Sequence, residues 1–141
     1  IFHLLLVYFS LAILSLLLGM GSLKGSKPED KIPVPAKHFD GTFVDQMDVV
    51  TECTQISIEG ATLVEGKRGE GTYAISFDNI EQVTFRLNAE RLTAAVKLRS
   101  GETQELVMNK NLRAFGRTTY GTYHIRLLNL RKIVISSSFK K

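Results

Sequence analysis

A chain of 141 residues, 44% of them hydrophobic and 23% charged, is long enough for one modest domain with its own core. Its formal net charge is a modest +4, but the charges are unevenly distributed along the chain. Its single cysteine, Cys53, excludes an intramolecular disulfide, a CxxC redox pair and a CxxCH haem site, so we expect a buried, unreactive thiol.

The first twenty residues, Ile1 to Met20, contain eight leucines and no charged side chain. A bilayer core needs about 20 apolar helical residues, so this stretch predicts a transmembrane helix over residues 1–20. The alternative is a secretory signal peptide cleaved after the small-x-small motif Gly19-Met20-Gly21, and a buried soluble helix is a third interpretation. The apolar run is longer than usual for a signal peptide and no basic residue precedes it, which favours a retained anchor.

Residues 21–36 are rich in Gly, Ser, Lys and Pro, and they predict an extended linker because Pro28, Pro33 and Pro35 break any helix. The lysines of this segment favour a cytoplasmic downstream domain by the positive-inside rule. An uncleaved signal-like helix, however, commonly exports the domain on its C-terminal side. We therefore expect a single-pass membrane protein with its β-domain on the exported side, periplasmic or extracellular.

Residues 37–141 contain no proline and alternate apolar with polar or small side chains, as half-buried strands do. Turn-forming residues separate the runs at short intervals. The pattern predicts an antiparallel β-sandwich or small barrel. The alternating runs are Tyr73-Ile75-Phe77, Val83-Phe85, Ala94-Val96-Leu98 and Tyr123-Ile125-Leu127, and the turn signals are Gly60, Gly66, Gly69, Ser100-Gly101 and Asn109 to Asn111.

An internal duplication sharpens this prediction, because residues 71–80 (GTYAISFDNI) reappear as residues 121–130 (GTYHIRLLNL). Each copy predicts a strand with three inward side chains, a tight corner at the Asn, and a second strand whose inward positions resume three residues later. The ungapped alignment extends further in both directions. It matches Gly66 with Gly116, Val83 and Phe85 with Ile133 and Ile135, and Ile56 and Ile58 with Leu106 and Met108.

The two copies differ in charge. Residues 28–90 carry five basic and twelve acidic side chains, whereas residues 91–141 carry eleven basic and two acidic ones. A basic half can bind anionic lipid headgroups or an acidic protein surface, and this attraction weakens with added salt. Nucleic acid is disfavoured because no recognised reading motif is present. The candidate partner or headgroup contacts are Arg113, Arg117, Arg126, Arg131 and Lys132.

The sequence offers no assembled catalytic or metal site. The three histidines, His3, His38 and His124, form no cluster with Cys53 or carboxylates at metal-ligand spacing. The loop Gly66-Lys67-Arg68-Gly69-Glu70-Gly71 lacks the Gly-Lys-Ser/Thr ending of a phosphate loop, so it predicts a hairpin turn. We therefore expect no cofactor, no metal and no enzyme activity.

Together these features predict an accessory or scaffolding subunit of a larger integral membrane protein complex, anchored by its helix and docking through its β-domain. The alternative is a membrane-tethered or secreted module that binds a small molecule or lipid. The tyrosine-containing strands discriminate between the two. Their apolar side chains pack against one another in a scaffold but line an open pocket in a ligand-binding module.

Overall fold

The computed structural model describes residues 32–136, which belong to a compact unit beginning at Ile32. The first copy of the repeat forms β1 (Gly41–Asp45), β2 (Val50–Ile58), β3 (Leu63–Arg68), β4 (Gly71–Ser76), the 3-10 turn η2 (Phe77–Asn79) and β5 (Ile80–Asn88). The second copy forms β6 (Arg91–Leu98), β7 (Thr103–Met108), β8 (Arg113–Thr118), β9 (Gly121–Arg126), the 3-10 turn η3 (Leu127–Asn129) and β10 (Leu130–Ile135).

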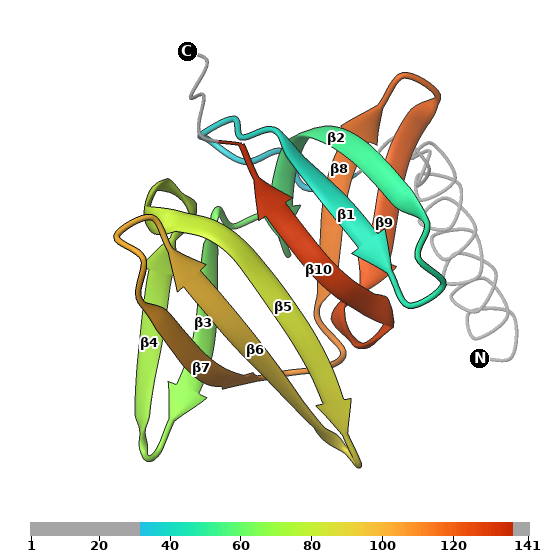
Figure 1. The fold of residues 1–141 in the computed structure, drawn as a ribbon. Coiled ribbons are helices and arrows are strands. Elements are labelled where there is room, and N and C mark those ends of the chain that lie inside the picture. Colours follow the sequence, from blue (N-terminus) through green and yellow to red (C-terminus); the bar gives the residue numbers. More distant parts are fainter. Residues whose placement is uncertain (1–31, 137–141) are drawn as a thin grey trace, which may run out of the picture. The chain divides into compact units, whose positions relative to one another are not determined.

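The ten strands form one antiparallel sheet in the order β4-β3-β7-β6-β5-β10-β1-β2-β8-β9, curled into a half-barrel (Figure 1). We call the first five strands of this order the β5 half-sheet and the last five the β10 half-sheet. The two half-sheets meet where β5 pairs with β10, and Val83 pairs there with Ile133, its own counterpart in the repeat. A pseudo-two-fold axis therefore passes between Val83 and Ile133.

The two copies exchange strands across this axis. In the β5 half-sheet, β7 of the second copy pairs with β3 of the first. In the β10 half-sheet, β2 of the first copy pairs with β8 of the second. Neither copy forms a complete half-sheet from its own strands, because β1 and β2 of the first copy lie in the β10 half-sheet and β6 and β7 of the second copy lie in the β5 half-sheet. The duplicated sequence thus encodes one interleaved domain rather than two domains in tandem.

The strand register corrects one part of the expected alignment. Gly41 pairs with Ile135 in β10, and Ala94 pairs with Phe85 in β5. Since Phe85 and Ile135 are repeat counterparts, Gly41 corresponds to Ala94, which lies 53 rather than 50 positions later. The ungapped match holds for the later strands of each copy and fails for the earlier ones. The predicted match of Ile56 and Ile58 with Leu106 and Met108 is therefore wrong.

One hydrophobic core covers the inner face of the sheet and takes side chains from both half-sheets. The inward alternation is seen in β6, where Leu92, Ala94 and Val96 are buried. As expected, each tyrosine-containing strand is followed by a tight corner at the Asn. In β5 the register shifts after Ile80, and the next buried residue is Val83, three positions later, as predicted. Tyr73 departs from the prediction of three inward side chains, because half of its surface is exposed.

Gly66 and Gly116 have a packing role, whereas Gly66 had been expected in a turn. A Cβ atom on Gly66 would lie 2.7 Å from Cβ of Leu106, and one on Gly116 would lie 2.6 Å from Cβ of Cys53. The exchanged strands approach closely at these two points, and only glycine leaves room for the side chain of the neighbouring strand. The equivalence also shows that Cys53, and not Ile56, is the counterpart of Leu106.

The predicted mainly β class is confirmed, but within residues 32–136 the strands form one curled half-barrel sheet, with β4 and β9 at its edges, rather than the predicted sandwich or small barrel. The loop at Gly69 is a hairpin turn, as predicted, and Gly69 adopts a φ of 64° there. Within residues 32–136 no helix is long and apolar enough to span a bilayer. The predicted anchor over residues 1–20 and most of the predicted linker lie outside the described residues.

Replacing Gly116 with Ala tests the close approach of the exchanged strands. We expect the free energy of unfolding to fall by about 1–3 kcal/mol, because the new methyl group would overlap Cys53 and force the strands apart. Urea unfolding monitored by circular dichroism measures the change. The matched control is Gly71→Ala, whose Cβ would meet nothing nearer than the Arg68 carbonyl oxygen at 3.8 Å. Equal stability of the two variants would contradict the packing role.

Candidate partner-binding face

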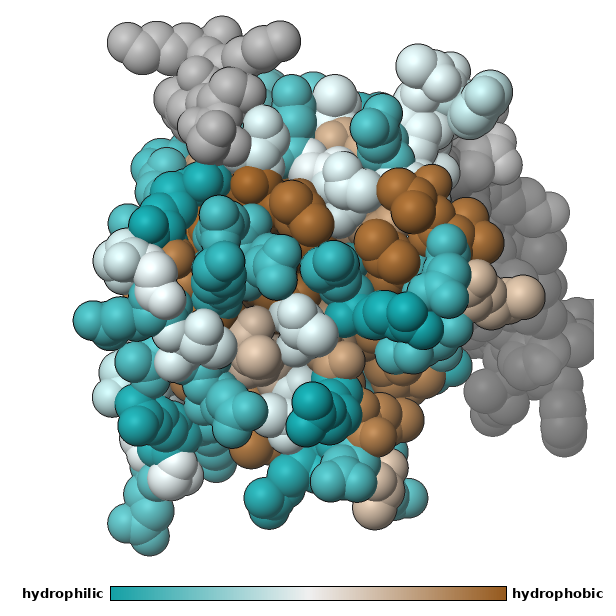
Figure 2. All heavy atoms as spheres, in the orientation of Figure 1, coloured by the Kyte–Doolittle hydropathy of each residue, from teal (hydrophilic) through white to brown (hydrophobic). Residues whose placement is uncertain are grey.

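Apolar side chains cover part of the outer face of β10, β1 and β2. Residues that alternate with the core point outward, and in these three strands they include Val134, Val44 and Val50. Val44 pairs directly with Val50, and Val134 pairs with Thr42. Figure 2 shows hydrophobic side chains gathered over these strands. Val50, the first residue of β2, is 61% exposed.

The turn between β1 and β2 extends this apolar surface. Met47 is 85% exposed and Val49 53% exposed. The turn is well ordered by hydrogen bonds, because Oδ1 of Asp45 accepts one from the Met47 amide at 2.8 Å and one from the Val49 amide at 3.0 Å. Asp48 forms an ion pair with Arg131. We call Val44, Met47, Val49, Val50 and Val134 the docking face.

An open groove of about 1140 Å³ borders the docking face, and Val50 and Val134 are among its lining residues. Its far side is the tip of the β8–β9 hairpin, where Tyr120 is 99% exposed. The Thr118 hydroxyl orders this tip by accepting a hydrogen bond from the Tyr120 amide at 3.1 Å and donating one to the Gly121 carbonyl at 3.0 Å. The groove is wider than most small-molecule pockets and suits a protein segment.

The five predicted contact residues do not form one patch. Arg117 lines the groove and donates a hydrogen bond from Nε to Oε1 of Gln55 at 3.2 Å. Lys132 pairs with Val44 at the margin of the docking face, and Arg131 lies at the β1–β2 turn through its pair with Asp48. Three of the five candidates therefore border the docking face.

Arg113 and Arg126 lie elsewhere. They pair with each other at the end of β8 and β9 that is opposite to the Tyr120 tip. The Arg113 guanidinium lies 5.1 Å from the ring centre of Phe115, and its Nε is 3.8 Å from Oε2 of Glu59. These contacts explain Arg113 as part of the local packing of β8, and they separate it from the docking face.

The charge difference between the two halves of the sequence does not separate a basic half-sheet from an acidic one. Strand exchange places residues 61–110 in and around the β5 half-sheet, and this range carries seven basic and seven acidic side chains. Residues 32–60 and 111–136 form the β10 half-sheet and carry six basic and five acidic ones. Both half-sheets are close to neutral, so the charge difference along the sequence does not become a charge difference between the two half-sheets.

Cys53 and Tyr123, which lie near the groove, both have raised pKa values. Cys53 is 4% exposed, and burial raises the pKa of its thiol to about 11. Burial also raises the pKa of the Tyr123 phenol, whose ring stacks on Phe43 with 5.5 Å between the centroids. Among residues 32–136, no three His, Cys, Asp or Glu side chains are grouped so that they could hold a metal ion.

Sequence reasoning missed the docking face and Tyr120. The alternation pattern carried a usable signal, because Val44, Val50 and Val134 occupy positions at which a solvated strand would have polar residues. Tyr120 follows two threonines in a turn, so no alternation pattern marked its side chain as exposed.

A family model with the description "Uncharacterised protein" matches residues 35–138, which is well over half of the chain. The match spans every strand of the sheet. No curated protein and no solved structure matches the chain.

Alkylation of Cys53 tests its burial. Since thiolates are the reactive species, iodoacetamide should label the native protein slowly at about pH 8 and faster as the pH approaches 11. The raised pKa also means that the fold loses stability as the pH rises from the ordinary thiol pKa of 9.0 through about 11. The control is the same protein unfolded in urea, which should react rapidly. Equal labelling rates for both forms at about pH 8 would show that the thiol is accessible.

Proposed function

We propose that this chain, which belongs to the family described as "Uncharacterised protein", is an accessory or scaffolding subunit that docks on a larger membrane protein complex through its β-domain. The observation that carries the proposal is the docking face. Val44, Val50 and Val134 lie at outward strand positions that alternation would otherwise fill with polar residues, and Met47 and Val49 are exposed in the adjoining turn. Exposed apolar patches of this kind mark protein contact sites.

The chemistry of the groove indicates the kind of partner. Val50 and Val134 offer aliphatic surface, whereas Tyr120 and Arg117 are residue types enriched at the energetic centres of protein interfaces. The Tyr120 ring is fully exposed on an ordered turn, so little conformational entropy is lost when a partner covers it. The fitting occupant is a segment of another protein that presents aliphatic side chains to the valines.

Membrane attachment is the part of the proposal that rests on sequence. The apolar run of residues 1–20 supports an anchor, and an anchored domain would meet its partner at a high local concentration. We further propose that the domain lies on the exported side. Anionic lipid is the competing partner, and Arg113 with Arg126 would be its contacts, each contributing about 1 kcal/mol near a charged surface.

Because both half-sheets are nearly neutral, apolar contact rather than overall charge should hold the partner. The association should therefore survive added salt, which screens exposed charges but does not weaken the burial of apolar surface. This expectation separates protein docking from lipid headgroup binding, which salt should release.

The variant Val50→Lys tests the docking face directly. The full-length protein is extracted from its native membrane with a mild detergent, and the co-migrating proteins are sized and identified by mass spectrometry at low and high salt. We expect the variant to retain at least about tenfold less partner than the wild type, because a lysine would bury its charge against aliphatic side chains.

The matched control is Leu87→Lys, which places the same residue at a 43% exposed apolar position of β5. The control should retain the partner as the wild type does. If the wild-type protein migrates alone at both salt concentrations, the scaffold proposal is wrong. Release of the co-migrating proteins at high salt, with no loss of them in Val50→Lys, would show that charged contacts rather than the docking face hold the partner.

A further inference from the structure

A second cavity lies in the β5 half-sheet, lined by residues of β3, β4, β6 and β7, and it shares no lining residue with the groove beside the docking face. It has a volume of about 390 Å³, within the range of small-molecule pockets. Tyr73, Ile75 and Leu98 supply its apolar wall, and Arg68 and Arg99 supply two positive charges. None of its lining residues is acidic. The proposed docking function gives this cavity no role.

The two guanidinium groups are held by neutral acceptors. Nη1 of Arg68 donates a hydrogen bond to the side-chain oxygen of Gln104. Nε of Arg99 donates to the Asp78 carbonyl at 3.1 Å, and its Nη2 donates to the carbonyl of Ser136 at 3.1 Å. These contacts orient the two side chains without neutralising them, so the pocket attracts an anion.

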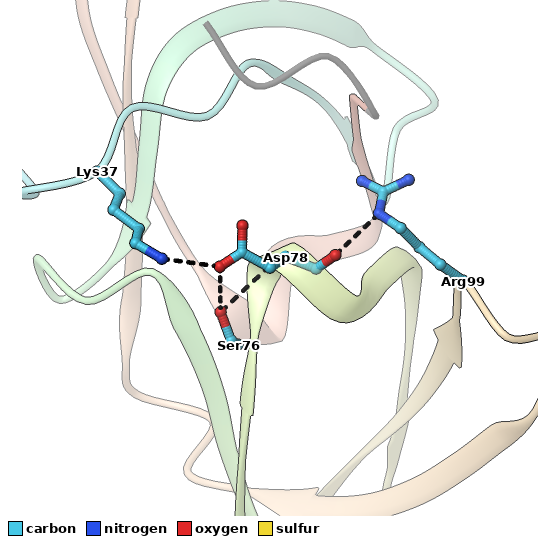
Figure 3. A network of polar contacts seen from close by, with 4 residues as sticks. All are labelled: Lys37, Ser76, Asp78 and Arg99. Carbon is cyan, nitrogen blue, oxygen red and sulfur yellow. Dashed lines mark hydrogen bonds and ion pairs between the residues drawn. The ribbon is translucent and has the colours of Figure 1, made fainter. Parts of the chain in front are cut away.

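The carboxylate of Asp78, the residue whose carbonyl oxygen Arg99 contacts, is paired with another cation. Oδ2 of Asp78 accepts hydrogen bonds from Nζ of Lys37 at 2.9 Å and from the Ser76 hydroxyl at 3.1 Å. Figure 3 shows the Asp78 carboxylate facing Lys37, while Arg99 reaches the main-chain oxygen of Asp78. The Lys37 ammonium lowers the pKa of the Asp78 carboxyl, which keeps this ion pair formed. Arg99 adds a smaller electrostatic contribution to this lowering, while its own hydrogen bonds go to main-chain carbonyl oxygens rather than to the carboxylate.

The equivalent position in the β10 half-sheet shows why the pocket is open on the side of Tyr73. Tyr123, the counterpart of Tyr73, stacks on Phe43 there. The register makes Val96 the counterpart of Phe43, because Val96 pairs with Val83 as Phe43 pairs with Ile133. A smaller side chain thus replaces the ring that covers Tyr123, and Tyr73 is left half exposed.

Both arginines are also specific to the β5 half-sheet. Arg68 pairs with Gly71 as Thr118 pairs with Gly121, so Thr118 is the counterpart of Arg68. The Arg99 amide donates a hydrogen bond to the Asn79 carbonyl at 2.9 Å, and the Gln46 amide donates in the same way to Asn129 at 3.0 Å. Gln46 is therefore the counterpart of Arg99. At the positions equivalent to Val96, Arg68 and Arg99, the β10 half-sheet therefore has Phe43, Thr118 and Gln46.

We infer that this pocket binds a small organic monoanion with a planar apolar body, such as an aromatic carboxylate. The carboxylate would lie between Arg68 and Arg99, whose planar guanidinium groups match its geometry. The planar body would stack on the exposed ring of Tyr73 and contact Ile75 and Leu98. Burial of the apolar body and pairing of the charge would both contribute to binding.

Isothermal titration of the full-length protein in a nonionic detergent tests the inference, with benzoate as the probe. Benzamide has the same shape without the charge, and acetate has the charge without the ring. We expect saturable binding of benzoate, with benzamide and acetate each at least about tenfold weaker. Binding of benzamide as tight as that of benzoate would overturn the inference, as would no saturation by benzoate up to about 10 mM.

Two variants place the binding in this pocket. Arg68→Thr and Arg99→Gln introduce the residues that the β10 half-sheet carries at the same positions, so the fold accommodates both. Each should weaken benzoate binding at least about tenfold. The control, Arg126→Gln, removes a cation outside the pocket and should leave the affinity unchanged. Circular dichroism checks that each variant is folded. If Arg99→Gln is unfolded, the test rests on Arg68→Thr, because Arg68 is exposed and its hydrogen bond goes to the neutral side chain of Gln104. Unchanged affinity in Arg68→Thr would contradict the inference.

Discussion

The structure depends on the exchange of strands between the two copies of the repeat. β2 completes the half-sheet of β8 and β9, and β7 completes the half-sheet of β3 and β4. The exchange is possible because Gly116 and Gly66 let a neighbouring strand pass within contact distance of their backbones. Each half-sheet therefore buries apolar side chains from both copies, and neither copy can form its share of the core alone. One cooperative domain results from this arrangement.

Pseudo-symmetry also explains where functional features can arise. Two half-sheets with the same strand order provide two equivalent frames, and one frame can change while the other keeps the core packed. In the β10 half-sheet, Phe43 covers Tyr123 and the outer face carries the exposed valines. In the β5 half-sheet, the corresponding tyrosine faces a cavity with two arginines. The strands of the docking face and those that line the pocket thus lie in different half-sheets, and Arg99 connects them through its hydrogen bonds to the carbonyls of Ile135 and Ser136.

The sequence predicted local features well. Alternation and the Gly-Thr-Tyr repeat predicted the tyrosine-containing strands, the corners at Asn79 and Asn129, and the hairpin at Gly69, because these depend on neighbouring residues. It did not predict the pairing of distant strands. The earlier strands of the two copies are displaced by three positions, and a bulge at Gln55, which has a φ of 51°, accommodates part of this difference. The charge difference along the chain also did not predict a charge difference between the half-sheets, because strand exchange places residues from both halves of the sequence in each half-sheet.

Nuclear Overhauser effects between strands test the central claim most directly. In a uniformly labelled full-length protein, strand exchange predicts cross-strand contacts between Ser57 and Phe115 and between Lys67 and Val107. Detection of both pairs would establish that each copy lends strands to the other. Contacts of β2 with β3 and of β7 with β8, in place of these pairs, would show that each copy folds on itself and would contradict the account.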